Sequence, residues 1–149
     1  MALNRDFVGR TYESSAPYEV SRVKIREFAA AIGERNPVCH DRDAAVAAGH
    51  PDLVAPPTFP IVFSLSSTGG ALADPGLGLD FSMVVHGEQR FEYDRPIYAG
   101  DELVCTSTIT EIRSVGRNEF LTLRSDVSTT SGESVCRTYN TIVERGGAA

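Results

Sequence analysis

The pattern of apolar and polar positions predicts helices in the first half of the chain and strands in the second. The first helical signal is a set of apolar residues that recur on one face of a helix: Ile25, Phe28, Ala29 and Ile32. Ser21 is a favourable N-cap, and Gly33 is typical of the position just after a helix end. We therefore predict a helix from Arg22 to Ile32.

Two weaker signals flank this helix. Tyr18 to Val20 favour a short edge strand before it. After it, Asn36-Pro37 marks a turn, because proline biases the preceding residue away from helix. Asp41 can then cap a second, shorter helix from Asp43 to Ala48.

The segment from Thr58 to Ala73 is apolar on nearly every side, which is typical of a buried helix. Its other members are small residues that allow another group to approach the backbone closely: Ser64, Ser66, Ser67, Gly69, Gly70 and Ala71. We expect this helix to form the centre of the fold.

From Met83 onward the apolar period changes to two, which is the period of a β-strand. Four strands are predicted, over Met83–Tyr93, Glu102–Arg113, Glu119–Thr129 and Ser134–Arg145. The short turns between the later strands require antiparallel neighbours. The polar positions of the first strand are expected to share one solvated face: His86, Glu88, Arg90 and Glu92. Residues Gly146 to Ala149 are expected to fray.

Helices followed by antiparallel strands define the α+β class rather than a series of βαβ units. We predict an antiparallel sheet that wraps around a long central helix, the segment from Thr58 to Ala73. The 149 residues, of which 42% are hydrophobic, fit a single domain over residues 1–149 whose core needs no disulfide or metal.

Charge and cysteine content narrow the function classes. A net charge of -6 disfavours binding to nucleic acid, which needs a basic surface, and to anionic membranes. Cys39, Cys105 and Cys136 form no C-x-x-C pair and are expected to be free thiols, so we predict a cytoplasmic location. No apolar run suits a signal peptide or a membrane helix. The histidines lack metal-ligand spacing and no nucleotide-binding glycine motif occurs, so neither a metal nor a cofactor is expected.

Three stretches of the chain together resemble the MaoC-like dehydratases, a family with the hot-dog fold. The stretches are residues 28–41, residues 55–59 and, most specifically, residues 86–101, which read HGEQRFEYDRPIYAGD. The subfamily that the chain resembles most is the FAS1-like dehydratases, which includes the A-type subunit of the heterodimeric (3R)-hydroxyacyl-ACP dehydratases. The resemblance implies a hot-dog fold and an acyl thioester substrate, linked to acyl carrier protein (ACP) or to CoA.

Catalytic members of this family carry an aspartate two residues before the asparagine of the Asn-Pro turn and a histidine three residues after it. This pair moves protons when water leaves a 3-hydroxyacyl thioester, and each positioned transfer is worth about 10²–10⁴-fold in rate. Here Glu34 and Cys39 occupy the two positions, and His40 follows one residue late. The resemblance therefore implies Glu34 and His40 as a degenerate catalytic pair.

The crossing into the long helix departs from the family as well. Catalytic members have His-Gly there, and a backbone N–H at the helix start binds the thioester carbonyl. In this chain the crossing contains Pro57, which has no N–H to donate. The residues that the resemblance implies in substrate binding are Asn36, Cys39, Thr58, Phe59 and Phe63.

We therefore expect a subunit of a (3R)-hydroxyacyl-thioester dehydratase or enoyl hydratase of fatty-acid metabolism. It would contribute acyl-chain binding in a homodimer, or in a heterodimer with a MaoC-like chain that supplies the catalytic histidine and aspartate. One alternative is an autonomous (R)-specific enoyl-thioester hydratase that uses Glu34 and His40. Another is a non-catalytic acyl-CoA-binding module or a thioesterase, although no carboxylate occurs between Thr58 and Ala73, where some hot-dog thioesterases have one.

Overall fold

The computed structural model describes residues 2–14 and 16–146 and has the α+β architecture that the sequence predicts. Its strands form one antiparallel sheet in the order β1-β4-β5-β6-β3, and β2 pairs with another part of β4. The strand bounds are β1 Thr11–Glu13, β2 Tyr18–Glu19, β3 Val84–Tyr93, β4 Glu102–Val115, β5 Asn118–Thr129 and β6 Ser134–Glu144. Of the residues expected to fray, 147–149 lie outside the described residues, whereas the backbone N–H of Gly146 donates a hydrogen bond to Asn118 Oδ1 at 3.1 Å.

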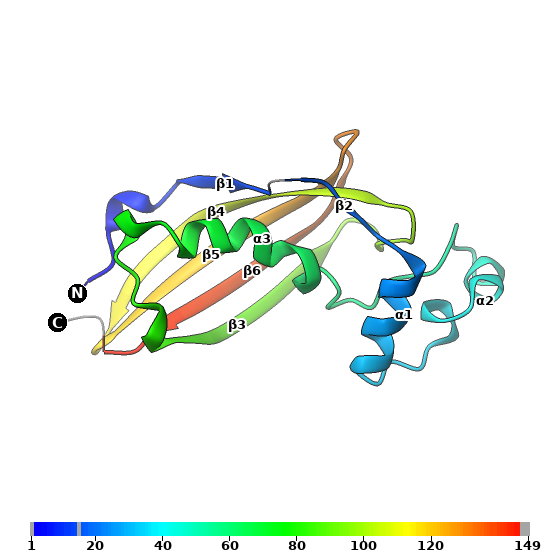
Figure 1. Cartoon of the computed structure of the whole chain (residues 1–149), viewed down its shortest axis with the longest axis horizontal. Coiled ribbons are helices and arrows are strands. Elements are labelled where there is room, and N and C mark those ends of the chain that lie inside the picture. Colours follow the sequence, from blue (N-terminus) through cyan, green and yellow to red (C-terminus); the bar gives the residue numbers. More distant parts are fainter. Residues whose placement is uncertain (1, 15, 147–149) are drawn as a thin grey trace.

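The three α-helices are α1 Arg22–Ala31, α2 Arg42–Ala47 and α3 Ile61–Leu72. Single 3-10 turns occur at Arg5–Phe7, Pro37–Cys39, Pro75–Leu77 and Phe81–Met83. The long helix α3 lies across one face of the curved sheet, whereas α1 and α2 lie together beyond one end of it (Figure 1). The sheet around a central helix is therefore confirmed.

The local signals for the first two helices are also confirmed. Ser21 Oγ accepts a hydrogen bond from Lys24 N at 3.1 Å, and Gly33 has a φ of 73° just after α1 ends. Asp41 caps α2, because its carboxylate accepts hydrogen bonds from the first backbone N–H groups of that helix. Strand β1 was not predicted, since three residues are too few to show a period.

The inner face of α3 is formed mostly by small and hydroxyl-bearing residues. Its buried residues are Phe63, Ser64, Ser67, Thr68 and Ala71. By contrast, Leu65 is 53% exposed. The prediction that α3 is buried on every side is therefore wrong in the isolated chain, where one side of the helix is exposed. The helix begins three residues later than predicted, because Pro60 stands at its N-cap and turns precede it.

A β-bulge in β3 changes the direction of one histidine. His86 lies opposite Ile142, but Glu88 lies opposite Thr141, so Gly87 is an additional residue in this strand. The bulge turns His86 toward the face that carries α3, where it lines a cavity with Leu65. His86 is exposed, as predicted, but it does not share a face with Glu88, because a period-two pattern does not account for the inserted residue.

The bulge depends on the absence of a side chain at Gly87. A Cβ atom there would lie 2.9 Å from Val143 Cγ2 and 3.1 Å from the Thr141 carbonyl oxygen. We expect Gly87→Ala to lower the free energy of unfolding in urea by about 1–3 kcal/mol, because overpacking forces neighbours to shift.

Gly69→Ala is the matched control, because a Cβ at this position in α3 meets no other described atom within 4 Å. It should raise the free energy of unfolding by about 0.5–1 kcal/mol. Unchanged stability of the Gly87 variant would contradict the close approach at the bulge.

Candidate functional site

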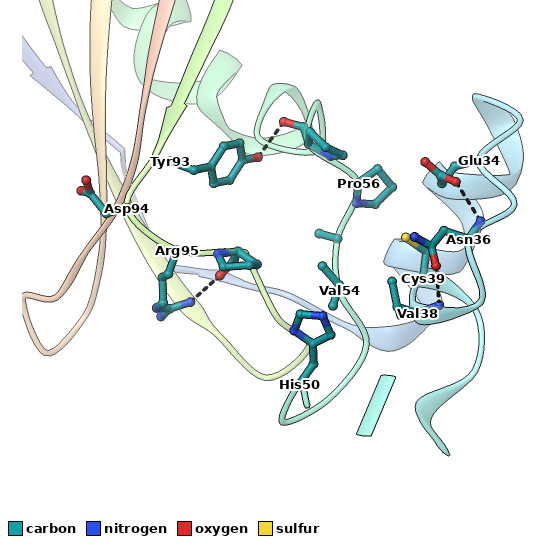
Figure 2. A pocket seen from close by; sticks show the side chains of 13 residues that line it. Glu34, Asn36, Val38, Cys39, His50, Val54, Pro56, Tyr93, Asp94 and Arg95 are labelled. Carbon is teal, nitrogen blue, oxygen red and sulfur yellow. Dashed lines mark hydrogen bonds between the residues drawn. The ribbon is translucent and has the colours of Figure 1, made fainter. Parts of the chain in front are cut away.

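A cavity of about 530 Å³ lies between the loop that follows α1, the crossing toward α3 and the end of β3 (Figure 2). It is lined by Glu34, Asn36, Val38, Cys39, His50, Val54, Ala55, Pro56, Pro57, Tyr93, Asp94, Arg95 and Pro96. Three of the residues singled out in the sequence, Glu34, Asn36 and Cys39, therefore meet in one cavity.

The loop after α1 is held by hydrogen bonds from its own side chains. The Glu34 carboxylate accepts a hydrogen bond from Asn36 N at 2.8 Å, and Asn36 Oδ1 accepts one from Val38 N at 3.2 Å. The asparagine thereby caps the 3-10 turn Pro37–Cys39. Both side chains border the cavity, with Glu34 half-buried and fixed in orientation by its backbone bond (Figure 2).

Cys39, where the resemblance implies a histidine in catalytic members, is only 4% exposed. Burial and the nearby negative charge of Glu34 raise the pKa of the Cys39 thiol. The thiol is therefore protonated at neutral pH and is a poor base and a poor nucleophile.

His40 does not line the cavity. Its Nε2 atom lies 2.7 Å from the carbonyl oxygen of Glu34, and its own carbonyl oxygen accepts a hydrogen bond from Arg26 Nε at 2.8 Å. Because Cys39 takes the inward position of the turn, the next residue along the chain points elsewhere. The one-residue offset thus separates His40 from the cavity that Glu34 borders.

The structure places a different histidine, His50, in the wall of the cavity (Figure 2). Its Nδ1 atom lies 3.3 Å from the Tyr98 hydroxyl. In the sequence, His50 belongs to an irregular Gly49-His50-Pro51 segment with no periodic signal. The bridge between Val54 and Tyr98 helps to bring this loop to the cavity, and that pairing has no local sequence signal.

The crossing toward α3 forms a further wall. The Tyr93 hydroxyl donates a hydrogen bond to the Pro57 carbonyl oxygen at 2.6 Å, which ties the crossing to the end of β3. Burial raises the pKa of Tyr93, so this hydroxyl remains a donor at physiological pH. Because Pro57 is a proline, it offers the cavity no backbone N–H that could bind a carbonyl oxygen.

The other three residues expected in substrate binding lie apart from this cavity. Thr58 is exposed, and Phe59 is fully buried in the apolar core. Phe63 stacks on Tyr18 with ring centroids 5.1 Å apart and lines a separate cavity of about 230 Å³ beside α3.

The wall next to β3 is a rigid corner. Arg95 Nη1 lies 2.9 Å from the Asp101 carboxylate, and Arg95 Nε lies 2.9 Å from that of Glu133. Hydrogen bonds to these two carboxylates raise the pKa of Arg95 and occupy its guanidinium group. Gly100, with a φ of 94°, completes the turn.

The sequence of this chain is similar to several known proteins. The chain is 55% identical over 148 residues to a UPF0336 protein of Thermobifida fusca, which covers 99% of this chain and 97% of that protein. It is 50% identical over 145 residues to UPF0336 protein SCO4636 of Streptomyces coelicolor, which covers 97% of each. The profile of the FAS1-like dehydratase domain region matches residues 6–138.

Among solved structures, the C-terminally truncated HadBC (3R-hydroxyacyl-ACP dehydratase) complex of Mycobacterium tuberculosis is similar, with a TM-score of 0.85 and 26% identity. The match covers 95% of this chain and 99% of that chain. The fold is thus the hot-dog fold of the MaoC-like dehydratases. Within that class, the chain belongs to the FAS1-like dehydratase family.

Within the part of the chain that the structure describes, every helix is too short or too polar to cross a membrane.

The effect of Glu34 on the pKa of Cys39 can be tested by removing the Glu34 charge. Glu34→Gln keeps an oxygen that can accept from Asn36 N but removes the negative charge beside the thiol. Alkylation of Cys39 by iodoacetamide at pH 8 should then become about two- to fivefold faster, because more thiolate forms. Mass spectrometry of the labelled peptides gives the rate for each cysteine.

The same digest contains the control. Cys105 and Cys136 are 2% and 0% exposed, and their labelling rates should not change. An unchanged rate for Cys39 in this variant would show that the Glu34 charge does not act on the thiol.

Proposed function

We propose that this chain is an acyl-binding subunit of a (3R)-hydroxyacyl-thioester dehydratase, which in reverse is an enoyl-thioester hydratase. The observation that carries the proposal is the chemistry of the two catalytic positions. Cys39 is a buried thiol with a raised pKa, and the His40 ring faces the carbonyl oxygen of Glu34 outside the cavity. Glu34 alone offers one carboxylate where dehydration needs both a base and an acid.

A cavity is nevertheless present at the positions that the resemblance implies for the site. The loop from Glu34 to Cys39, the crossing at Pro57 and the end of β3 at Tyr93 enclose a cavity of about 530 Å³. That volume is in the range of small-molecule sites. A catalytic partner chain would supply the histidine and aspartate, while this chain contributes surface that binds the acyl thioester.

Strand β3 is the proposed place for the partner. It is ten residues long and lies at one end of the strand order, so it presents unpaired backbone groups to another strand. Large apolar residues are exposed along this edge on both faces of the sheet, and we call them the edge patch: Leu65, Phe81, Met83 and Val85. A partner hot-dog chain that pairs with β3 would cover both the backbone edge and the edge patch.

A fatty-acid pathway and a cytoplasmic location are also part of the proposal. The three cysteines are buried and free, which supports a reducing compartment. The similarity to the (3R)-hydroxyacyl-ACP dehydratase complex supports the acyl thioester as substrate.

Hydration of a 2-enoyl-CoA tests the catalytic part of the proposal. We expect the purified chain alone to stay near background, and a mixture with a catalytic MaoC-like chain to be at least about tenfold faster than either alone. The loss of enoyl absorbance follows the reaction. Activity of the chain alone that His40→Ala abolishes would instead favour the autonomous Glu34 and His40 enzyme. Absence of acyl-thioester binding with and without partner would contradict the proposal.

The proposed interface is tested by charge insertion on β3. Val85→Asp should weaken association with the partner or with a second copy by about tenfold or more, because a carboxylate would be buried against apolar surface. Val115→Asp is the control, since Val115 is 50% exposed in the β4–β5 hairpin, away from the edge patch. Light scattering after gel filtration gives the assembly state of each variant. The same assembly state for Val85→Asp and Val115→Asp would exclude β3 as the interface.

A further inference from the structure

The free edge of the sheet at β3 carries two opposite charges on either side of one uncharged residue. Glu88 and Arg90 are exposed on the outer face of the sheet, and Gln89 between them points to the face that carries α3. Strand β3 is the outermost strand beside β6 (Figure 1). The order acid, amide, base therefore follows an edge whose backbone groups have no neighbouring strand in the single chain.

The Gln89 carboxamide has no hydrogen-bond partner among the described residues. Both its Oε1 and its Nε2 are buried and unpaired. Asn140, directly opposite on β6, does not satisfy them, and its own Oδ1 is unpaired as well. Buried polar groups without partners destabilise a protein, and native structures contain few of them. The Gln89 carboxamide therefore indicates a partner from outside the single chain.

A second copy of β3 can supply that partner. Most homodimers have two-fold symmetry, so an edge strand that pairs with itself runs antiparallel to its copy. With Gln89 on the two-fold axis, the two Gln89 side chains lie opposite each other on the same face, with Cβ atoms about 4.5–5.5 Å apart. A carboxamide both donates and accepts, so two of them related by this axis can form a reciprocal pair of hydrogen bonds.

The charges on the outer face favour the same register. With Gln89 on the axis, each Glu88 lies opposite Arg90 of the second copy, and both contacts are attractive. Moving the axis to Glu88 or to Arg90 places like charges opposite each other. An axis between two residues is excluded, because it joins the outer face of one copy to the inner face of the other.

The length of the strand separates the one remaining register with attractive charges. An axis at Phe91 joins Arg90 to Glu92 of the second copy, but it leaves the Gln89 carboxamides apart and pairs only the end of the strand. Gln89 lies near the middle of β3, which spans Val84–Tyr93, so an axis there pairs almost the whole strand. The amide, the charges and the strand length thus agree on Gln89.

We propose that this chain forms a homodimer in which β3 pairs with β3 of a second copy, with Gln89 on the two-fold axis. The inference concerns self-association and does not rest on acyl binding. The catalytic partner proposed above uses the same edge, so homodimer and mixed assembly exclude each other at β3. The homodimer is then a resting form, from which the catalytic partner displaces one copy.

Cysteine crosslinking in the full chain tests the register. Gln89→Cys should give a disulfide-linked dimer with oxidised glutathione, because the Cα atoms of directly opposed residues lie about 4.5–5.5 Å apart, within the range of a disulfide. Glu88→Cys, Arg90→Cys and Phe91→Cys are the matched controls, since each is displaced from its own copy by about 7 Å or more along the strand. Non-reducing electrophoresis gives the yield, and the wild-type chain, whose cysteines are buried, gives the background.

Charge reversal tests the contacts between Glu88 and Arg90. Glu88→Arg and Arg90→Glu should each weaken self-association by about tenfold or more in sedimentation equilibrium, because each variant creates two like-charge contacts. Arg90 also pairs with Glu92 in its own chain, so Arg90→Glu alone could act on folding. An equimolar mixture of the two variants should associate within about threefold of wild type, since every contact then joins opposite charges. Recovery in the mixture also requires that both variant chains are folded.

The outcomes separate the inference from the proposed function. A chain that is monomeric alone and assembles only with the catalytic MaoC-like chain would overturn the inference and leave the proposed function intact. Crosslinking at Glu88→Cys, Arg90→Cys or Phe91→Cys in place of Gln89→Cys, or a mixture no tighter than the single variants, would overturn the register and the inference with it. A Gln89→Cys crosslink whose yield the catalytic chain does not lower would support the homodimer and contradict β3 as the place of that partner.

Discussion

The close packing of α3 on the sheet is the constraint on which the rest of the structure depends. Ser64, Ser67 and Thr68 occupy the inner face of the helix, so its backbone approaches the strands without bulky side chains between them. The Ser67 and Thr68 hydroxyls donate hydrogen bonds to the Ser64 carbonyl oxygen, at 3.1 and 2.9 Å respectively. Because the inner face is narrow, cavities of about 230 and 280 Å³ remain beside the helix.

The walls of the candidate cavity are held in place by hydrogen bonds and ion pairs that do not involve Cys39 or His40. The Asn36 cap shapes the loop, the Tyr93 hydroxyl ties the Pro57 crossing to β3, and the Arg95 corner fixes the opposite wall. These contacts border the cavity. A cavity held in this way fits the proposal above, in which this chain binds substrate and a partner carries out the chemistry.

Most of the regular structure was predictable from the sequence because its signals are local. Period, caps and turn residues sufficed for α1, α2 and four strands, with errors of one or two residues at the ends. The exposure of Leu65 was not predictable, because it depends on how far the sheet reaches around α3. The direction of His86 was also missed, since Gly87 inserts a residue that a strict alternation does not contain.

The site was predictable only in part. The resemblance to the dehydratases implied Glu34, Asn36 and Cys39, and these residues share one cavity. His50 was missed because the pairing of Val54 with Tyr98, remote in the sequence, brings its loop to the cavity. The unpaired carboxamides of Gln89 and Asn140 are visible only when hydrogen bonds are counted across strands.

The most direct test of the central claim, that this chain holds the acyl chain for a catalytic partner, is photo-crosslinking in the mixed assembly. The probe is a decenoyl-CoA with a diazirine at the end of its chain, and peptide mass spectrometry locates the crosslinks. We predict crosslinks on residues of this chain that line the candidate cavity, such as Val38 and Val54. Crosslinks confined to the partner, with none on this chain, would contradict the claim.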